Sequence, residues 1–213
     1  MSDPQTRARR RYNKDLFDIL LFPLYRRIGG LLPASLAPNA ITLTGTLFGL
    51  LGSLGVLFIQ ARWALLLAPP LYILYHLCDT LDGQHARETA QTSRLGEFLD
   101  HALDGLVVLG FYIAVIHRFE LQGTFYLVLL ALRAYHSLLF LGALKVSGKA
   151  YNPALGPATE VWLFSIAYLA AFLLPEQAQE IARWGLVLAF AAILISIVST
   201  FRHAWREVAE TQG

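Results

Sequence analysis

The sequence predicts an all-α integral membrane protein, with six transmembrane helices that follow an amphipathic interfacial helix. Apolar residues make up 56% of the 213 residues and charged residues only 15%, whereas about a quarter is usual in soluble domains. Several apolar runs approach the length of about 20 residues that crosses a hydrocarbon core. Short polar segments separate these runs, and their basic residues are distributed unevenly, as in a polytopic membrane protein.

The N-terminal part is too polar to cross a membrane. Residues 1–11 form a basic tail that we expect to be disordered, and no cleavable signal peptide is apparent. Residues 12–32 predict an amphipathic helix that lies in the interface and ends at Gly29 and Gly30. Its apolar face consists of Phe17, Leu20, Leu21, Leu24 and Ile28.

Residues 33–205 are expected to form one transmembrane catalytic domain, and residues 206–213 a cytoplasmic tail. The single cysteine, Cys78, excludes an internal disulfide bond. The basic cluster Arg7–Arg11 lacks interleaved aromatic residues, so no nucleic-acid partner is expected. The six expected spans are residues 39–60, 63–86, 95–117, 122–145, 157–174 and 181–202.

The basic residues predict the orientation in the membrane. If the N-terminus is cytoplasmic, 13 of the 17 Lys and Arg residues lie on that side. Only Arg62, Arg118 and Arg183 fall on the other side, and Arg133 lies within the fourth span. This asymmetry follows the positive-inside rule. Both termini are therefore expected in the cytoplasm, in a membrane of the bacterial inner-membrane type.

The first span carries glycines at short intervals. Gly45, Gly49, Gly52 and Gly55 repeat every three or four residues, which places them near one face of a helix. Small residues at such spacing let neighbouring transmembrane helices approach closely. We therefore interpret them as packing residues.

Acidic residues gather where the second span ends and the third begins. Asp79 and Asp82 are three residues apart, and Asp100 and Asp104 are four apart, so each pair shares a helix face. Carboxylates crowded near a membrane repel one another unless cations neutralise them. Oxygen ligands favour Mg²⁺, Mn²⁺ or Ca²⁺ over zinc. The alternative interpretation is a solvated or salt-bridged polar loop.

The residues around these carboxylates suit a phosphate group. Gly83 and Ala86 are small, which would let a phosphate or a sugar come close to the helix backbone. Arg87 offers a planar fork for phosphate oxygens. Carboxylate-held metal ions and an arginine are the recurring parts of phosphoryl transfer.

The full motif reads Asp79-x2-Asp82-Gly83-x2-Ala86-Arg87-x8-Gly96-x3-Asp100-x3-Asp104. With every position filled, it resembles the signature of a known family, the CDP-alcohol phosphotransferases (CDP-alcohol phosphatidyltransferases). The residues Ala37–Leu43 are also similar to the segment at which the first span of that family begins. The resemblance is close over about residues 37–105, and the plan of six spans agrees with the family.

The resemblance implies a metal-dependent transfer to an acceptor hydroxyl, with release of CMP. It implies two Mg²⁺ or Mn²⁺ ions, a CDP-alcohol donor, a lipid acceptor or donor from the bilayer, and a homodimer. Asp104 would be the usual general base, and Arg87 would contact the diphosphate. The metal ligands would be Asp79, Asp82, Asp100 and Asp104, and the nucleotide would bind near Asn39, Thr42, Gly83 and Ala86.

Local strings are similar to the choline- and ethanolaminephosphotransferase branch, which makes His101 a second candidate for the base. These strings are Asp82–Arg87, Gly96–His101 and Thr159–Val161. Glu160 could orient His101, although Ala102, His85 and Glu88 depart from the branch pattern. The alternatives are that His101 forms a hydrogen bond within the bundle and that Glu160 is a helix-start carboxylate.

Arg133 and His136 lie one turn apart in the fourth span. They could bind an acceptor or a lipid phosphate, or pair with a carboxylate.

Two versions of the reaction follow from the resemblance. In the favoured version CDP-choline or CDP-ethanolamine donates to diacylglycerol. In the alternative, CDP-diacylglycerol donates to a small polar alcohol such as glycerol phosphate, inositol or serine. A hypothesis of another class is a divalent-cation transporter that uses the same carboxylates.

Overall fold

The computed structural model describes residues 16–147 and 157–212. The expected basic tail and Lys149 lie outside these ranges. All regular elements of the described residues are helical. They are α2 (Leu16–Gly29), α3 (Pro38–Phe58), α4 (Ala64–Glu88), α5 (Arg94–Arg118), α6 (Thr124–Ser147), α7 (Pro157–Leu173), the short 3₁₀ helix η1 (Pro175–Gln177) and α8 (Ala178–Gln212).

Local sequence signals set several of these boundaries. Pro38 opens α3, where its missing N–H costs nothing and its fixed φ suits a helix. Ser93 caps α5, because its side chain accepts a hydrogen bond of 2.9 Å from the Gly96 N–H. α2 ends at Gly29, within the expected Gly29–Gly30 pair.

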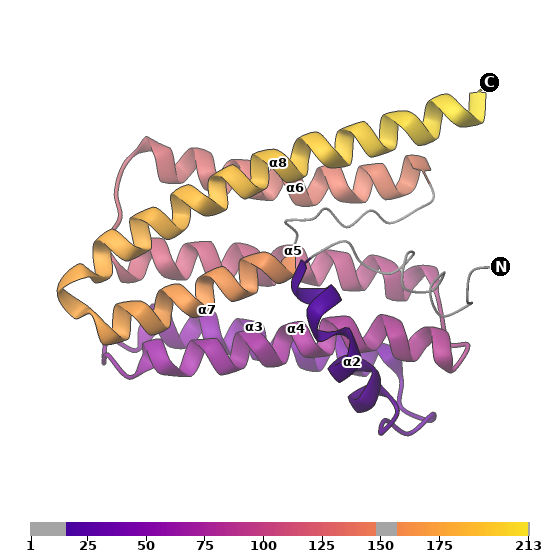
Figure 1. The fold of residues 1–213 in the computed structure, drawn as a ribbon, viewed down its shortest axis with the longest axis horizontal. Helices are drawn as coiled ribbons and strands as arrows, with labels where there is room; N and C mark the ends of the chain where they lie inside the picture. The colour runs from indigo at the N-terminus through magenta and orange to yellow at the C-terminus, as the bar shows by residue number, and fades with distance from the viewer. Residues whose placement is uncertain (1–15, 148–156, 213) are drawn as a thin grey trace.

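The six long helices pack side by side. Figure 1 shows α6 and α8 along one side of the bundle, α3 and α4 along the other, and α5 and α7 between them. α3 packs on both α4 and α5, α4 packs on α7, and α8 packs on both α6 and α7. α2 lies across the bundle and contacts α4 and α7.

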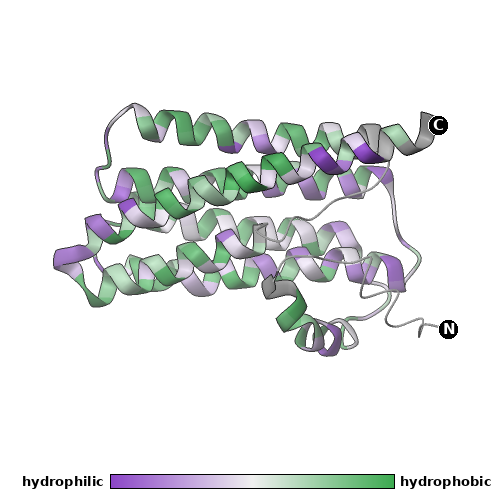
Figure 2. Cartoon of the chain, turned by 45° about the horizontal axis from the view of Figure 1, so that its top comes forward, coloured by the Kyte–Doolittle hydropathy of each residue, from purple (hydrophilic) through white to green (hydrophobic). Residues whose placement is uncertain are grey.

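Hydropathy identifies an integral membrane protein. Among the residues that the structure describes, five helices are long and apolar enough to cross a membrane: α3, α4, α5, α6 and α8. Figure 2 shows hydrophobic residues along most of the helix lengths and hydrophilic residues gathered towards the ends. α7 is the exception to the expected six, because its 17 residues extend about 26 Å, somewhat less than the hydrocarbon core.

The glycine face of α3 meets its neighbours closely, as the sequence predicts. A Cβ atom added at Gly45 would lie 2.7 Å from the Cβ atom of Cys78 on α4, and one at Gly49 would lie 2.3 Å from Val107 on α5. At Gly52 the nearest atom would belong to Tyr72, at 2.6 Å. α3 therefore lies against both helices that carry the aspartates.

Two boundaries differ from the expected ones. α8 continues as a helix to Gln212, whereas the expected span ended at residue 202 and the tail began at 206. The apolar pattern marks only the segment that suits a membrane, and a helix can continue beyond it into polar sequence. The described α2 is also shorter than the expected 12–32, since Leu31 and Leu32 form a turn after Gly29.

Candidate metal and phosphate site

A short connection brings the acidic ends of α4 and α5 together. α4 ends at Glu88, and Ala90 then adopts a left-handed φ of 57°, as residues just after a helix often do. The Gln91 N–H donates 2.8 Å back to the carbonyl of Ala86, which closes the turn. The chain then enters α5 at Ser93, so Asp79 and Asp82 near the end of α4 face the first turns of α5.

The four carboxylates form one cluster. Asp79 interacts electrostatically with Asp82, Asp100 and Asp104. Asp100 and Asp104 also lie close to His101, and one ligand atom from each of these three residues falls within 4.8 Å of the others. The arrangement agrees with the expected convergence of the two aspartate pairs.

Two hydroxyl groups support this cluster from inside the bundle. The Thr42 hydroxyl on α3 donates to Oδ2 of Asp82, whose residue is only 4% exposed. The Tyr75 hydroxyl on α4 donates to Oδ1 of Asp104 over 2.9 Å. The sequence assigned Thr42 to a nucleotide site and did not single out Tyr75. The sequence gives no signal of this role, because a tyrosine in an apolar span can equally be a packing residue of the helix core.

The donor set fits a hard divalent cation. The residues offer carboxylate oxygens, which Mg²⁺, Mn²⁺ and Ca²⁺ prefer, with one imidazole beside them. Within the described part of the chain, Oδ1 of Asp100 is buried and has no hydrogen-bond partner, so it is available as a ligand. Clustered, half-buried carboxylates need positive charge to remain ionised together, and a divalent cation supplies it.

The residues expected to contact phosphate lie on the last turns of α4. Arg87 is exposed, and its guanidinium passes over Gly83, where an added Cβ would lie 3.1 Å from Nη1. Arg87 also interacts electrostatically with Asp100. Gly83, Ala86 and Arg87 thus lie beside the carboxylate cluster, at its open end.

Asn39 approaches the same region from α3. A Cβ atom added at Gly96 would lie 3.0 Å from both Oδ1 of Asn39 and the Ser93 hydroxyl. Gly96 therefore lets the start of α3 and the first turn of α5 come together. The first turn of α3 contributes Asn39 and Thr42 to the same end of the bundle.

His101 lies between the carboxylates and α6. Its Nδ1 atom is 3.6 Å from Oδ2 of Asp100. Its ring meets the edge of Phe140, with 4.9 Å between the ring centroids. One ring nitrogen thus faces a carboxylate, and the aromatic contact restricts the rotation of the ring.

Glu160 pairs with Arg133. The Nε atom of Arg133 on α6 lies 3.2 Å from Oε2 of Glu160 in the first turn of α7, and both residues are at most 5% exposed. Arg133 also contacts Nδ1 of His136 at 3.3 Å, and Nε2 of His136 lies 2.8 Å from the Ser196 hydroxyl on α8. Of the two expectations for Arg133, the geometry favours pairing with a carboxylate.

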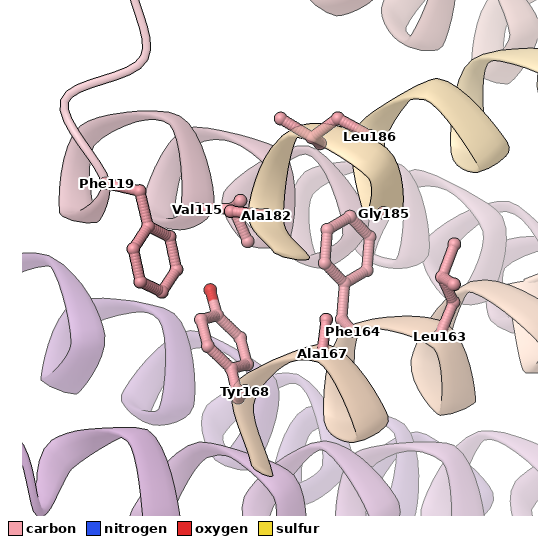
Figure 3. A pocket seen from close by; sticks show the side chains of 9 residues that line it. All are labelled: Val115, Phe119, Leu163, Phe164, Ala167, Tyr168, Ala182, Gly185 and Leu186. Atoms are coloured by element: carbon pink, nitrogen blue, oxygen red, sulfur yellow. The ribbon is translucent and has the colours of Figure 1, made fainter. Parts of the chain in front are cut away.

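A separate apolar cavity lies away from the carboxylates. Figure 3 shows it between α5, α7 and α8, with the Tyr168 hydroxyl pointing into it. Val115 on its wall is eleven residues beyond Asp104, about 16 Å along α5. This cavity is therefore distinct from the acidic site.

Comparison with known proteins matches most of the chain to one family. The model of the family described as CDP-alcohol phosphatidyltransferase matches residues 35–201, which include the whole carboxylate cluster, Arg133 and Glu160. The match thus extends well beyond the aspartate motif, into α8.

Individual relatives match shorter parts. Cholinephosphotransferase 1 of Saccharomyces cerevisiae is 33% identical over 94 residues, which are 41% of this chain and 24% of that protein. Cholinephosphotransferase 1 of Gallus gallus is 37% identical over 113 residues, 48% of this chain and 34% of that protein. CDP-diacylglycerol–serine O-phosphatidyltransferase of Encephalitozoon cuniculi is 32% identical over 154 residues, 67% of this chain and 39% of that protein.

These matches cover only part of each relative. The first two cover about a quarter and about a third of their lengths. All three relatives come from eukaryotes, so they lend no support to the expected membrane of the bacterial type.

Proposed function

Because the chain belongs to the CDP-alcohol phosphatidyltransferase family, we propose that it is a membrane enzyme that transfers the substituted phosphate of a CDP-alcohol to an acceptor hydroxyl. The observation that carries this proposal is the convergence of Asp79, Asp82, Asp100 and Asp104 at the facing ends of α4 and α5. The oxygen of the acceptor forms the new bond to the phosphorus distal to cytidine, the bond to CMP breaks, and the hydroxyl proton passes to a base.

The four aspartates would hold two divalent cations, Mg²⁺ or Mn²⁺. When bound, such ions neutralise phosphate oxygens and the charge on the leaving group. The side chains themselves orient the substrate. Arg87, exposed at the rim, would bind the diphosphate through its planar fork. Gly83 has no side chain and so leaves space on the helix surface for that guanidinium.

His101 is the base that we favour. With Nδ1 held near Asp100, its other ring nitrogen, Nε2, is the atom that would accept the proton of the hydroxyl. Asp104 is the second candidate. Glu160 would act on His101 only indirectly, since its carboxylate pairs with Arg133.

We propose CDP-choline or CDP-ethanolamine as donor and diacylglycerol as acceptor. The names of the yeast and chicken relatives support this version. CDP-diacylglycerol with serine or a similar small alcohol is the second candidate, favoured by the relative of Encephalitozoon cuniculi, which matches a longer part of the chain. We further propose six spans, both termini in the cytoplasm, and a homodimer, on the basis of the charge asymmetry and the family.

The test is a substrate-pair assay on purified protein in lipid nanodiscs. Each CDP-linked donor is offered with each acceptor, in Mg²⁺ or Mn²⁺, and CMP and lipid product are measured. We expect product from CDP-choline or CDP-ethanolamine with diacylglycerol. Product from CDP-diacylglycerol alone would overturn the favoured version, and no turnover with any pair would contradict the whole proposal.

Two variants complete the assay. Asp82→Asn should lose turnover, because it removes one charge from the cation site, and EDTA should stop the wild-type reaction. His101→Ala should lower kcat by about 10²–10⁴-fold, the usual contribution of general acid–base catalysis, while CDP binding is retained. Unchanged turnover of His101→Ala would instead favour Asp104 as the base.

A further inference from the structure

Tyr75 supplies a hydroxyl to the acidic site from the core of the bundle. The hydroxyl donates to Oδ1 of Asp104 over 2.9 Å, and the tyrosine is only 2% exposed. We propose that Tyr75 is a positioning residue, which fixes the orientation of the Asp104 carboxylate for cation binding. This inference rests on the proposed function, because it assumes that Asp104 is a metal ligand.

Close packing around the Tyr75 ring restricts the position of its hydroxyl group. A Cβ atom added at Gly49 on α3 would lie 3.3 Å from Cγ of Tyr75, so the glycine gives the ring its space. Phe111 on α5 meets the ring edge to face, at 5.8 Å between centroids and 80° between planes. A tyrosine has only two side-chain torsions to fix, so these neighbours determine the position of its oxygen.

The identity of the residue also points to a polar role. Tyr75 belongs to a buried cluster that contains the apolar side chains of Val107, Val108 and Phe111, together with three further tyrosines, Tyr72, Tyr112 and Tyr168. Packing alone would be served by phenylalanine, whereas a buried hydroxyl costs free energy unless it is hydrogen-bonded. Its partner here is a carboxylate, and hydrogen bonds to charged groups are the stronger kind.

The hydrogen bond leaves the other oxygen of Asp104 for a cation. A carboxylate with one oxygen held by a donor loses rotational freedom before the ion arrives, so less ordering is needed on binding. Thr42 holds Asp82 in the same manner from α3. Each of the two helix ends thus has one aspartate fixed by a hydroxyl group. Removal of such supporting partners typically weakens metal affinity about 10–100-fold.

The test measures Mn²⁺ binding by the full-length protein in nanodiscs, by electron paramagnetic resonance of the free ion. Tyr75→Phe removes a single oxygen atom and keeps the ring. We expect its Kd for Mn²⁺ to rise by about 10–100-fold. The Mn²⁺ concentration for half-maximal turnover should rise by the same factor, and turnover at saturating Mn²⁺ should largely recover. An unchanged Kd would overturn the proposal.

A matched control and a double variant separate positioning from packing. Tyr168→Phe alters another buried tyrosine, which faces the cavity of Figure 3, and should leave Mn²⁺ binding unchanged. In an Asp104→Ala background, which lacks the acceptor oxygen, adding Tyr75→Phe should change the Kd less than twofold, because the hydroxyl acts through Asp104. If Tyr75→Phe still weakens Mn²⁺ binding or unfolds the protein in the Asp104 variant, Tyr75 is a packing residue and the proposal is wrong.

The wild-type protein distinguishes this inference from the proposed function. Wild-type protein that binds no Mn²⁺ would overturn both. Normal wild-type binding and turnover, with equal Mn²⁺ affinity in Tyr75→Phe, would overturn only the role of Tyr75.

Discussion

Single atoms decide how closely side chains approach one another around the carboxylate cluster. Gly83 lies beneath the Arg87 guanidinium, and Gly96 lies against Asn39 and Ser93. In both places the hydrogen of a glycine occupies the space that a methyl group would need. The small residues in the aspartate motif thus have a steric reason to be small, which is separate from their proposed role towards a nucleotide.

Gly83→Ala tests this at the residue scale. The added Cβ would lie 3.1 Å from Nη1 of Arg87 and 3.4 Å from Nη2, so the flexible guanidinium should move while the helix stays intact. We expect unchanged thermal stability and a kcat/KM for the CDP-linked donor about tenfold lower, a loss of about 1.4 kcal/mol of transition-state stabilisation. Gly142→Ala, with no atom within 4 Å, is the control. Equal kinetics for the two variants would contradict the proposed contact.

The residues that the sequence predicted and those that it missed differ in a physical way. Helical spacing identifies Asp79 and Asp82 as sharing a face, because that depends only on the geometry of one helix. The pairing of Arg133 with Glu160 depends on how α6 meets α7, and periodicity carries no such information. Tyr75 was missed for the same reason, since its partner is 29 residues away on another helix.

At the scale of elements, α3 packs against both helices that carry the aspartates. Its glycines let it pack on α4 and α5 at short range, and its first turns contribute Asn39 and Thr42 to the site. The boundaries of α3, α4 and α5 lie within two residues of the expected spans, because apolar length and polar ends coincide there. Two other helices were less predictable. α8 continues beyond its apolar run, and α7 is short for a membrane span.

Gly45→Ala and Gly55→Ala form a matched pair on this helix. The Cβ added at Gly45 would lie 2.7 Å from Cβ of Cys78 and 3.2 Å from the carbonyl oxygen of Tyr75, both rigid atoms, so α3 and α4 must separate. We expect a loss of about 1–3 kcal/mol in the free energy of unfolding. At Gly55 the nearest atom would be 3.8 Å away, and alanine should be neutral or slightly stabilising. Thermal unfolding in detergent measures both, and equal stabilities would refute the close packing.

At the scale of the whole molecule, the two ends of the bundle differ in chemistry. The connection between α4 and α5 lies at the end with the carboxylates and Arg87. The connections that contain Gln122 and Glu176 lie together at the opposite end (Figure 1). An enzyme that takes a water-soluble nucleotide and a lipid needs its site at one water-facing end, within reach of the bilayer. The distribution of Lys and Arg predicts that this end faces the cytoplasm.

Cysteine labelling tests this orientation, and with it the role of α7 as a span. Cys78→Ala removes the only native thiol, after which Thr92→Cys, Gln122→Cys and Glu176→Cys each add one at an exposed position. An impermeant maleimide applied to intact cells should label the thiols at positions 122 and 176. The thiol at position 92 should react only after lysis, because the single helix α5 lies between positions 92 and 122 and places them on opposite sides of the membrane.

The result at position 176 shows whether α7 crosses the membrane. Because α6 is long and apolar enough to cross the membrane, Gln122 and Glu176 lie on the same side only if α7 crosses it as well. The 17 residues of α7 extend about 26 Å, which is close enough to the hydrocarbon thickness for modest thinning of the bilayer to compensate. Labelling of position 176 from the same side as position 92 would mean that α7 does not cross, and the chain would then have five spans, with its termini on opposite sides.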